Sequence, residues 1–170
     1  MYNHEPKGYV CPFCLIVDGF ENAHLYTKQD DIVYKDDYVT AFIASGWWKN
    51  NKGHVIIIPN SHIENLYELP SELSYKIHDL EKEIAFALKE TYKCDGISTR
   101  QHNEPCGDQD VWHYHLHVFP RYKNDNLYKS DRENSTPEER EEYAKKLRKY
   151  FVSKYTKWFT IVNNCVVDKL

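Results

Sequence analysis

The sequence predicts an α+β fold built from five short strands, one main helix and a C-terminal helical extension. Residues 113–119 alternate histidine with apolar or aromatic side chains, and strict alternation is the period of a β-strand. Residues 71–93 instead repeat apolar side chains at steps of three and four, which is the period of a helix that faces a core. The length of 170 residues suits one domain with a core of its own.

Five runs of strand-forming residues predict the strands, at residues 32–34, 39–43, 54–59, 96–101 and 113–119. The first two flank Asp36 and Asp37, so they are expected to form a hairpin with an Asp-rich turn. The third is a near-continuous β-branched run, which indicates a strand buried on both faces and ended by Pro59. Residues 44–53, with two tryptophans, are expected to form a loop.

The main helix is expected to run from Ser71 to about Lys93. Ser71 follows a proline and is a residue type that caps helix N-termini, and Gly96 is a stop signal just beyond the other end. The side chains that define its apolar face are Leu73, Ile77, Leu80, Ile84 and Leu88. A stripe of this kind is the face that a helix buries.

A second helix is predicted near the C-terminus. Pro137 would occupy its first position, and Thr136 and Glu139 have the spacing of a capping box. We expect this helix to run to about Tyr155 and its apolar side chains to dock on the body. Residues 158–167 are predicted to be a strand or an extended tail.

The composition changes at residue 123. Residues 1–122, which contain the alternating histidines, are predicted to form the main domain, and the charge-dense residues 123–170 an extension that packs on it or continues the same domain. We interpret the charges of residues 123–154 as a solvated helix face.

Charge and hydropathy exclude several classes of function. A net charge of -4 with interspersed signs gives no basic footprint for a nucleic acid polymer, although local groups can still hold a small anion. No segment is apolar enough to span a bilayer, and the first residues lack the apolar core of a signal peptide. We therefore expect a soluble cytoplasmic protein with no membrane partner.

The three histidines at residues 113, 115 and 117 would share one face of their strand, roughly 6.5 Å apart along it. A buried sheet face is not normally lined with three titratable rings. Either all three bind one metal ion, as in a metallo-oxygenase or metallohydrolase, or they divide the roles of nucleophile, acid and structural ligand. A neutral imidazole attacks phosphorus without prior deprotonation, so the second reading predicts a nucleotidyl-histidine intermediate.

Four segments, in the right order, resemble those of the histidine-triad (HIT) nucleotide hydrolases and transferases. They are the alternating histidines of residues 113–119, the Gly-His-apolar-Pro-x-x-His stretch of residues 53–62, Asn103-Glu104 with Gly107-x-Gln109, and Pro120-Arg121. The resemblance covers residues 11–122. It implies a five-stranded antiparallel sheet with a helix packed on it, and a homodimer.

The resemblance also implies roles for individual residues. His115, the middle histidine, would be the nucleophile on the α-phosphate, with His117 and His54 flanking it. Asn103 and Gln109 would contact phosphate or ribose. The expected activity is that of a phosphohydrolase, resembling the diadenosine-polyphosphate hydrolases, on dinucleoside polyphosphates, nucleoside phosphoramidates or adenylylated compounds. The alternatives are a nucleotidyltransferase with the same intermediate and a nucleotide-binding module without turnover.

Five cysteines without a signal peptide argue against a disulfide framework, and only the Cys11-x-x-Cys14 pair has a telling spacing. That pair alone fits a metal site, a redox site or two buried thiols. In HIT proteins with an N-terminal Cys-x-x-Cys, the first triad histidine binds zinc, and a second histidine completes the site. The resemblance thus implies a structural zinc held by Cys11, Cys14, His62 and His113.

Two positions depart from the family pattern. Ala44 lies near the position where the family often has an acidic or amide side chain that holds the ribose. Asp110 replaces the usual Ser or Thr just before the triad, and a carboxylate repels phosphate unless it is paired, so it is expected to bond a histidine or Arg100. Trp47 and Trp48 are expected to pack, with base stacking as the alternative.

Overall fold

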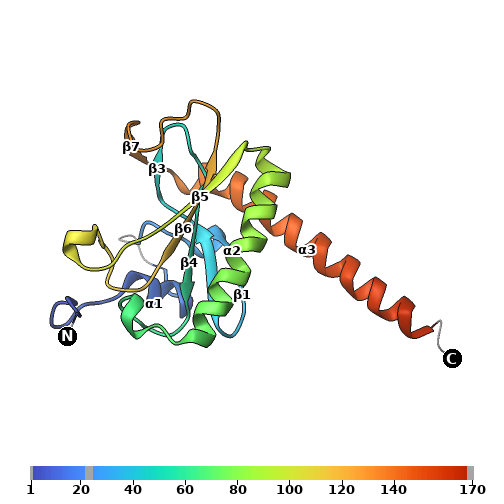
Figure 1. Cartoon of the computed structure of the whole chain (residues 1–170), viewed down its shortest axis with the longest axis horizontal. Coiled ribbons are helices and arrows are strands. Elements are labelled where there is room, and N and C mark those ends of the chain that lie inside the picture. The colour runs from blue at the N-terminus through green and yellow to red at the C-terminus, as the bar shows by residue number, and fades with distance from the viewer. Residues whose placement is uncertain (1, 22–24, 168–170) are drawn as a thin grey trace.

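The computed structural model describes residues 2–21 and 25–167, and only the backbone path from residue 157 onward. Its centre is an antiparallel five-stranded sheet in the order β1-β2-β4-β6-β5, which confirms the predicted α+β fold (Figure 1). The strands are β1 (Ile32–Lys35), β2 (Val39–Ile43), β4 (Val55–Pro59), β5 (Gly96–Gln101) and β6 (Leu116–Arg121). Three short 3-10 helices lie in the segments between the main elements, η1 (Gln29–Asp31), η2 (Leu66–Glu68) and η3 (Pro105–Gly107).

Both faces of the sheet are covered. The long helix α2 (Ser71–Tyr92) and the C-terminal helix α3 (Pro137–Val167) bury one face, and the short helix α1 (Pro12–Val17) packs on the other. In β4, Val55 and Ile57 join the α2 side while Ile56 and Ile58 join the α1 side. This two-sided burial is why β4 is an unbroken apolar run rather than an alternating one.

The ends of the main helix differ from the prediction in detail. Pro70 is the N-cap, with Ser71 inside the helix, and Lys93 ends the helix in the left-handed conformation at φ 57°. Gly96 is therefore not the stop signal, because it already opens β5. The histidine strand also starts later than predicted: β6 begins at Leu116, and residues 113–115, which follow a bend, lie outside it.

Residues 44–53 are not simply a loop. Strand β3 (Gly46–Trp48) pairs antiparallel with β7 (Arg132–Asn134), which belongs to the C-terminal extension. The two form a small second sheet beside the main one (Figure 1). Part of the charged segment is thus a strand, and the interpretation of residues 123–154 as one solvated helix face was wrong at this point.

Helix α3 begins as predicted. The backbone N–H of Thr136 donates to the Glu139 carboxylate at 2.9 Å, and the Glu139 N–H donates to the Thr136 hydroxyl at 3.3 Å, which makes the capping box. The helix runs to Val167, so the predicted strand or tail at residues 158–167 was wrong. No proline or glycine follows Pro137 before that point, and nothing in the sequence stops the helix earlier.

A buried ion pair fastens α3 to the body. The Arg140 guanidinium is 1% exposed and donates to the Asp31 carboxylate at 2.8 Å and to the backbone carbonyls of Tyr26 and Ser135. Burial raises the pKa of Asp31 even though Arg140 donates to it. We propose that residues 123–170 fold together with residues 1–122 as one unit.

Arg140→Met is expected to destabilise the whole protein by about 3–5 kcal/mol, because it leaves the Asp31 carboxylate buried without its partner. The measurement is urea unfolding followed by circular dichroism. Lys145→Met, at an exposed ion pair on the same helix, is the control and should change stability by less than about 1 kcal/mol. Loss of α3 alone, as a separate earlier transition, would contradict the single folding unit.

Candidate functional site

Three buried histidines come together on the α1 side of the sheet. The His115 and His117 rings are 5.1 Å apart, and the His54 and His117 rings are 5.4 Å apart. The antiparallel pairing of β4 with β6 produces this arrangement, because it sets Ile56 opposite His117 and so brings the residue before β4 alongside. The histidines predicted to be catalytic thus lie together, as Tyr114 and Leu116 turn to the opposite core.

The ring of His115 is held in one orientation. Its Nδ1 lies 2.7 Å from the backbone carbonyl of His113, an acceptor that requires the proton to be on Nδ1. Its Nε2 therefore carries the lone pair, and the nearest acidic oxygen to it is on Asp110, 3.7 Å away. This tautomer is the one a nucleophilic imidazole needs.

Burial keeps the cluster neutral. Burial lowers the pKa of His54 to about 3, with the Arg132 and Arg100 guanidinium groups adding to the effect. Burial likewise lowers the pKa of His115 and the pKa of His117. For His117, the neighbouring rings of His115 and His54 lower the pKa further. All three rings are therefore neutral at pH 7, so they offer lone pairs and N–H donors rather than fixed positive charge.

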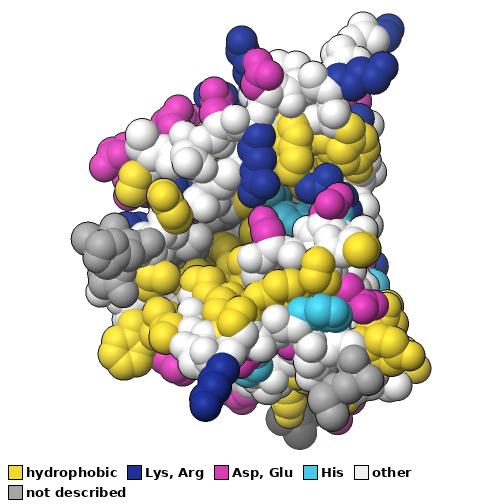
Figure 2. All heavy atoms as spheres, turned by 90° about the vertical axis from the view of Figure 1, so that its left-hand side faces the viewer, with side chains coloured by type: hydrophobic (Ala, Val, Ile, Leu, Met, Phe, Trp, Pro, Cys, Tyr) yellow, Lys and Arg dark blue, Asp and Glu magenta, His cyan; other side chains and the backbone are white. Residues whose placement is uncertain are grey.

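A pocket opens over these rings. Figure 2 shows histidine side chains in a hollow whose rim carries both basic and acidic side chains. The inner part is lined by Phe13, Ala44, His54, His115 and His117, and the outer part by Trp48, Arg100, His102, Asp108, Asp110 and Arg132. The pocket has one apolar wall and one charged rim, which suits an amphipathic ligand such as a nucleotide.

Sequence reasoning missed part of this lining. Arg132 lay in the segment interpreted as a solvated helix face, and His102 was not among the predicted site residues. Only the pairing of β3 with β7 brings Arg132 to the pocket, and no local motif marks such a contact. Asp110 lies near His115, but its carboxylate is 3.7 Å from His115 Nε2, too far for the expected hydrogen bond.

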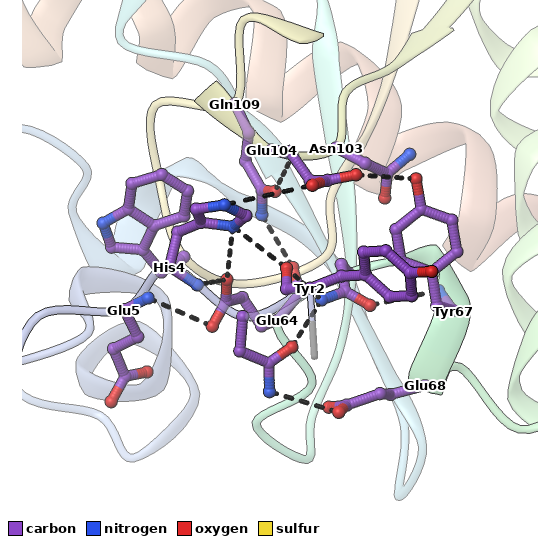
Figure 3. A network of polar contacts seen from close by, with 12 residues as sticks. Tyr2, His4, Glu5, Glu64, Tyr67, Glu68, Asn103, Glu104 and Gln109 are labelled. Atoms are coloured by element: carbon purple, nitrogen blue, oxygen red, sulfur yellow. Dashed lines mark hydrogen bonds and ion pairs between the residues drawn. The ribbon is translucent and has the colours of Figure 1, made fainter. Parts of the chain in front are cut away.

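The two amides predicted to bind substrate are engaged by the protein itself. The Gln109 side chain is buried, accepts from the Glu104 N–H at 2.8 Å and donates to the Glu64 carbonyl at 2.7 Å. Asn103 accepts from the Leu66 N–H at 2.8 Å. Figure 3 shows both amides within the network that ties the loop before the triad to residues 64–68. Their contact with phosphate or ribose stays a prediction.

The four predicted metal ligands meet in one cluster. One donor atom from each of Cys11, Cys14, His62 and His113 lies within 4.8 Å of all the others. Cys11 Sγ is 3.4 Å from His113 Nδ1, and Cys14 Sγ is 3.1 Å from His62 Nδ1. In a tetrahedral zinc site, bond lengths of ~2.1–2.3 Å put such ligand atoms roughly 3.5 Å apart, so the cluster fits a metal ion of this kind.

Both histidines of the cluster turn the same nitrogen inward. His113 Nε2 lies 3.0 Å from the Pro59 carbonyl, and His62 Nε2 lies 2.7 Å from the Glu5 carboxylate. These outer acceptors hold the proton on Nε2, which leaves both Nδ1 lone pairs facing the thiols. A carbonyl or carboxylate behind a ligating histidine is the usual support of a metal site.

The redox reading of the cysteine pair is only half met. Cys11 is the N-cap of α1, as that reading requires. The five-stranded sheet is antiparallel throughout, however, so α1 is not the crossover helix of a βαβ unit. Burial and the neighbouring Cys11 raise the pKa of Cys14 to about 12, which opposes the reactive thiolate that redox chemistry uses.

Comparison with known proteins gives one consistent result. A family model described as "HIT domain" matches residues 26–124. "Protein hit" of Bacillus subtilis is 32% identical over 148 residues, which cover 84% of this chain and 95% of that protein. The "Adenylylsulfatase HINT3" of Arabidopsis thaliana is 26% identical over 121 residues, covering 71% of this chain and 57% of that protein.

One solved structure with the same fold contains a bound metal ion. It is described as a "ZN-bound histidine triad family protein" from Mycobacterium smegmatis and matches with a TM-score of 0.70 at 26% identity. The match covers 86% of this chain and 96% of that one. In the part of this chain that the structure describes, no helix is both long and apolar enough to cross a membrane.

Proposed function

Because the chain belongs to the HIT family, whose members are nucleotide hydrolases or transferases, we propose that it is a nucleotide phosphohydrolase that works through a nucleotidyl-His115 intermediate. Its substrates would be dinucleoside polyphosphates, nucleoside phosphoramidates or adenylylated compounds. The observation that carries the proposal is the His115 ring, whose Nδ1 is bound to the His113 carbonyl and whose Nε2 lone pair is left for attack.

In the first step, His115 Nε2 attacks the α-phosphorus. A P–N bond forms while the bond to the leaving group breaks, and the leaving group departs with the electron pair. In the second step, water attacks the same phosphorus, the P–N bond breaks and its electron pair returns to His115 Nε2, and the proton that the water loses passes to the solvent. The competing transferase function keeps the intermediate and replaces water by another acceptor.

The pair of His117 and His54 supplies a donor to the phosphate. His117 Nδ1 lies 3.3 Å from His54 Nε2, and His54 Nδ1 is buried without a partner. A buried unpaired acceptor costs less than a buried unpaired N–H. His54 therefore holds its proton on Nε2 and donates to His117 Nδ1. His117 then carries its own proton on Nε2, where it can donate a hydrogen bond to a phosphate oxygen.

We propose that the cluster of Cys11, Cys14, His62 and His113 holds a structural zinc ion. Zinc would supply a cross-link between α1, the segment after β4 and the start of the histidine segment. The carbonyl of His113 holds the nucleophile, so the cluster braces the ring that reacts. A single ion bound by all three triad histidines receives no support, because His113 turns toward the thiols and His115 Nδ1 toward a carbonyl.

The homodimer and the cytoplasmic location stay proposals. Strand β5 forms one edge of the sheet, and a second copy added there would continue the sheet across the two subunits. Sedimentation velocity measures the mass in solution directly. A monomer at micromolar concentration would oppose the dimer.

The pH dependence of turnover follows from the lowered pKa of His115. Burial lowers this pKa from 6.5, so the neutral nucleophile persists as the pH falls through that value. We expect kcat/KM to stay level through pH 6.5 and to fall only at lower pH, measured between about pH 5 and pH 8 with the zinc content followed in parallel. An acid limb centred at or above pH 6.5 would contradict the assignment.

The direct test is a turnover assay with diadenosine tetraphosphate and an adenosine phosphoramidate. Hydrolysis of either to AMP, with a label from the α-phosphate trapped on the protein after rapid quenching, supports the proposal. AMP binding with no turnover of any adenylylated substrate would replace it by the nucleotide-binding module. Products carrying an acceptor other than water would favour the transferase.

A further inference from the structure

Arg132 comes from the C-terminal extension to the edge of the histidine pocket. It pairs opposite Trp48 in the β3–β7 sheet, and its guanidinium carbon lies 5.4 Å from the centre of the Trp48 ring. It also lies against Gly46, where an added Cβ would come within 3.0 Å of its Nε and Nη2. Gly46 thus leaves the space that the guanidinium occupies.

Arg100 lies against the same tryptophan from β5. Its guanidinium carbon is 4.8 Å from the Trp48 ring centre and 5.3 Å from that of Phe119. Its Nε is buried with no hydrogen-bond partner. Both arginines line the outer part of the pocket together with His117. Trp48 therefore holds two guanidinium groups beside the histidine that would donate to the phosphate.

Neither arginine forms a direct ion pair within the part of the chain that the structure describes. Among the residues that the structure describes, no carboxylate oxygen lies within the 4.0 Å of an ion pair to Arg100 or Arg132. The other two arginines nearby in sequence behave differently, since Arg121 pairs with Asp125 and Arg140 with Asp31. An unpaired guanidinium at the rim of a pocket is suited to a planar, bidentate contact with a phosphate group.

Acidic groups share the rim. Asp108 and Asp110 line the same outer pocket, so the pocket has no excess of positive formal charge. Whether the pocket binds a given anion then depends on which side of the pocket, acidic or basic, the negative charges of that anion occupy. The carboxylate of Asp110 is beside His115, and a substrate benefits only if its additional phosphates lie on the arginine side.

We infer that Arg132 and Arg100 bind the phosphate groups of the leaving group, so that the enzyme prefers nucleoside polyphosphate substrates over phosphoramidates. The inference rests on the proposed function and names the substrate class of the same pocket. A polyphosphate leaving group presents several charged oxygens to the two guanidinium groups. The amine that leaves a phosphoramidate presents none. Trp48 acts as the platform that sets the two cations side by side.

The test compares two substrates in four proteins. In Arg132→Ala, kcat/KM for diadenosine tetraphosphate should fall about 10- to 100-fold, the loss expected for charge-assisted hydrogen bonds, while kcat/KM for adenosine phosphoramidate changes less than about threefold. Arg132→Lys keeps the positive charge but lacks the planar guanidinium that makes two parallel hydrogen bonds. Its kcat/KM for diadenosine tetraphosphate should lie between those of the wild type and Arg132→Ala. Lys129→Ala removes an exposed positive charge from the same extension and should leave both substrates unaffected.

Binding of inorganic tripolyphosphate, measured by calorimetry, provides a readout that needs no turnover. Its affinity should weaken in Arg132→Ala by a similar factor and stay unchanged in Lys129→Ala. Equal losses for both substrates, or an unchanged ratio of their kcat/KM values, would overturn the inference while leaving the proposed function in place. Failure of the wild-type protein to turn over either substrate would instead overturn the proposed function and this inference with it.

Discussion

His115→Ala and His115→Gly are expected to lower turnover of diadenosine tetraphosphate by roughly 10⁴-fold or more, the scale of losing a nucleophile that no neighbour replaces. His117 is the nearest ring, 5.1 Å away, but its Nδ1 is paired with His54, and its ring is stacked on Phe119. It is not placed to take over the attack. The measurement is single-turnover kinetics with α-phosphate label, which separates formation of the intermediate from its hydrolysis.

The glycine variant adds a second readout. Imidazole supplied in solution should enter the space left by the ring and restore part of the activity in His115→Gly, whereas the alanine variant leaves less room. Zinc content should match that of the wild type, because His115 contributes no donor atom to the metal cluster, whereas the cavity left by the buried ring should lower thermal stability. Retained turnover, or loss of zinc on changing His115, would show that the division of roles among the histidines is wrong.

Cys14→Ser is expected to have the largest effect on stability. It removes one of the two thiols from a cluster that joins α1 to the body, and structural zinc contributes ~10 kcal/mol or more of binding free energy to small domains. We expect the purified variant to contain well under one zinc per chain and to unfold at a markedly lower temperature. Cys106→Ser is the matched control, since Cys106 is an exposed free thiol outside the cluster and should retain zinc.

A milder change should give a graded result. Glu5→Gln keeps an acceptor near His62 Nε2 but removes the charge, and loss of such a support lowers metal affinity by about 10- to 100-fold. Competition with a chromogenic chelator measures that affinity. Wild-type protein that contains no metal, yet is stable and active, would contradict the proposed zinc site.

How much the sequence reveals depends on whether a feature is local. The histidine face was predictable because strand alternation fixes which side chains share a face, even though β6 begins only at Leu116. The metal cluster joins residues about 100 positions apart, and only the resemblance to a family placed His62 and His113 with the cysteines. The geometry agrees with that set.

Other features depend on pairings that a linear pattern does not contain. Arg132 reaches the pocket because β7 pairs with β3, and both strands have only three residues, too few to show a period. Gln109 belongs to a motif that implies substrate contact. Its side-chain amide is nevertheless buried and forms hydrogen bonds with the backbone of Glu64 and Glu104. Charge density along a segment says nothing about which of its members turns inward.

Residues 2–5 form hydrogen bonds with the segment that follows His62. The backbone N–H groups of His4 and Glu5 both donate to the Glu64 carboxylate, and the Asn65 side chain donates to the Tyr2 carbonyl at 3.3 Å (Figure 3). Because Glu5 also supports His62, these first residues belong to the metal site's framework. Removal of residues 2–5 would therefore take away the Glu5 carboxylate behind His62 as well as the backbone donors to Glu64.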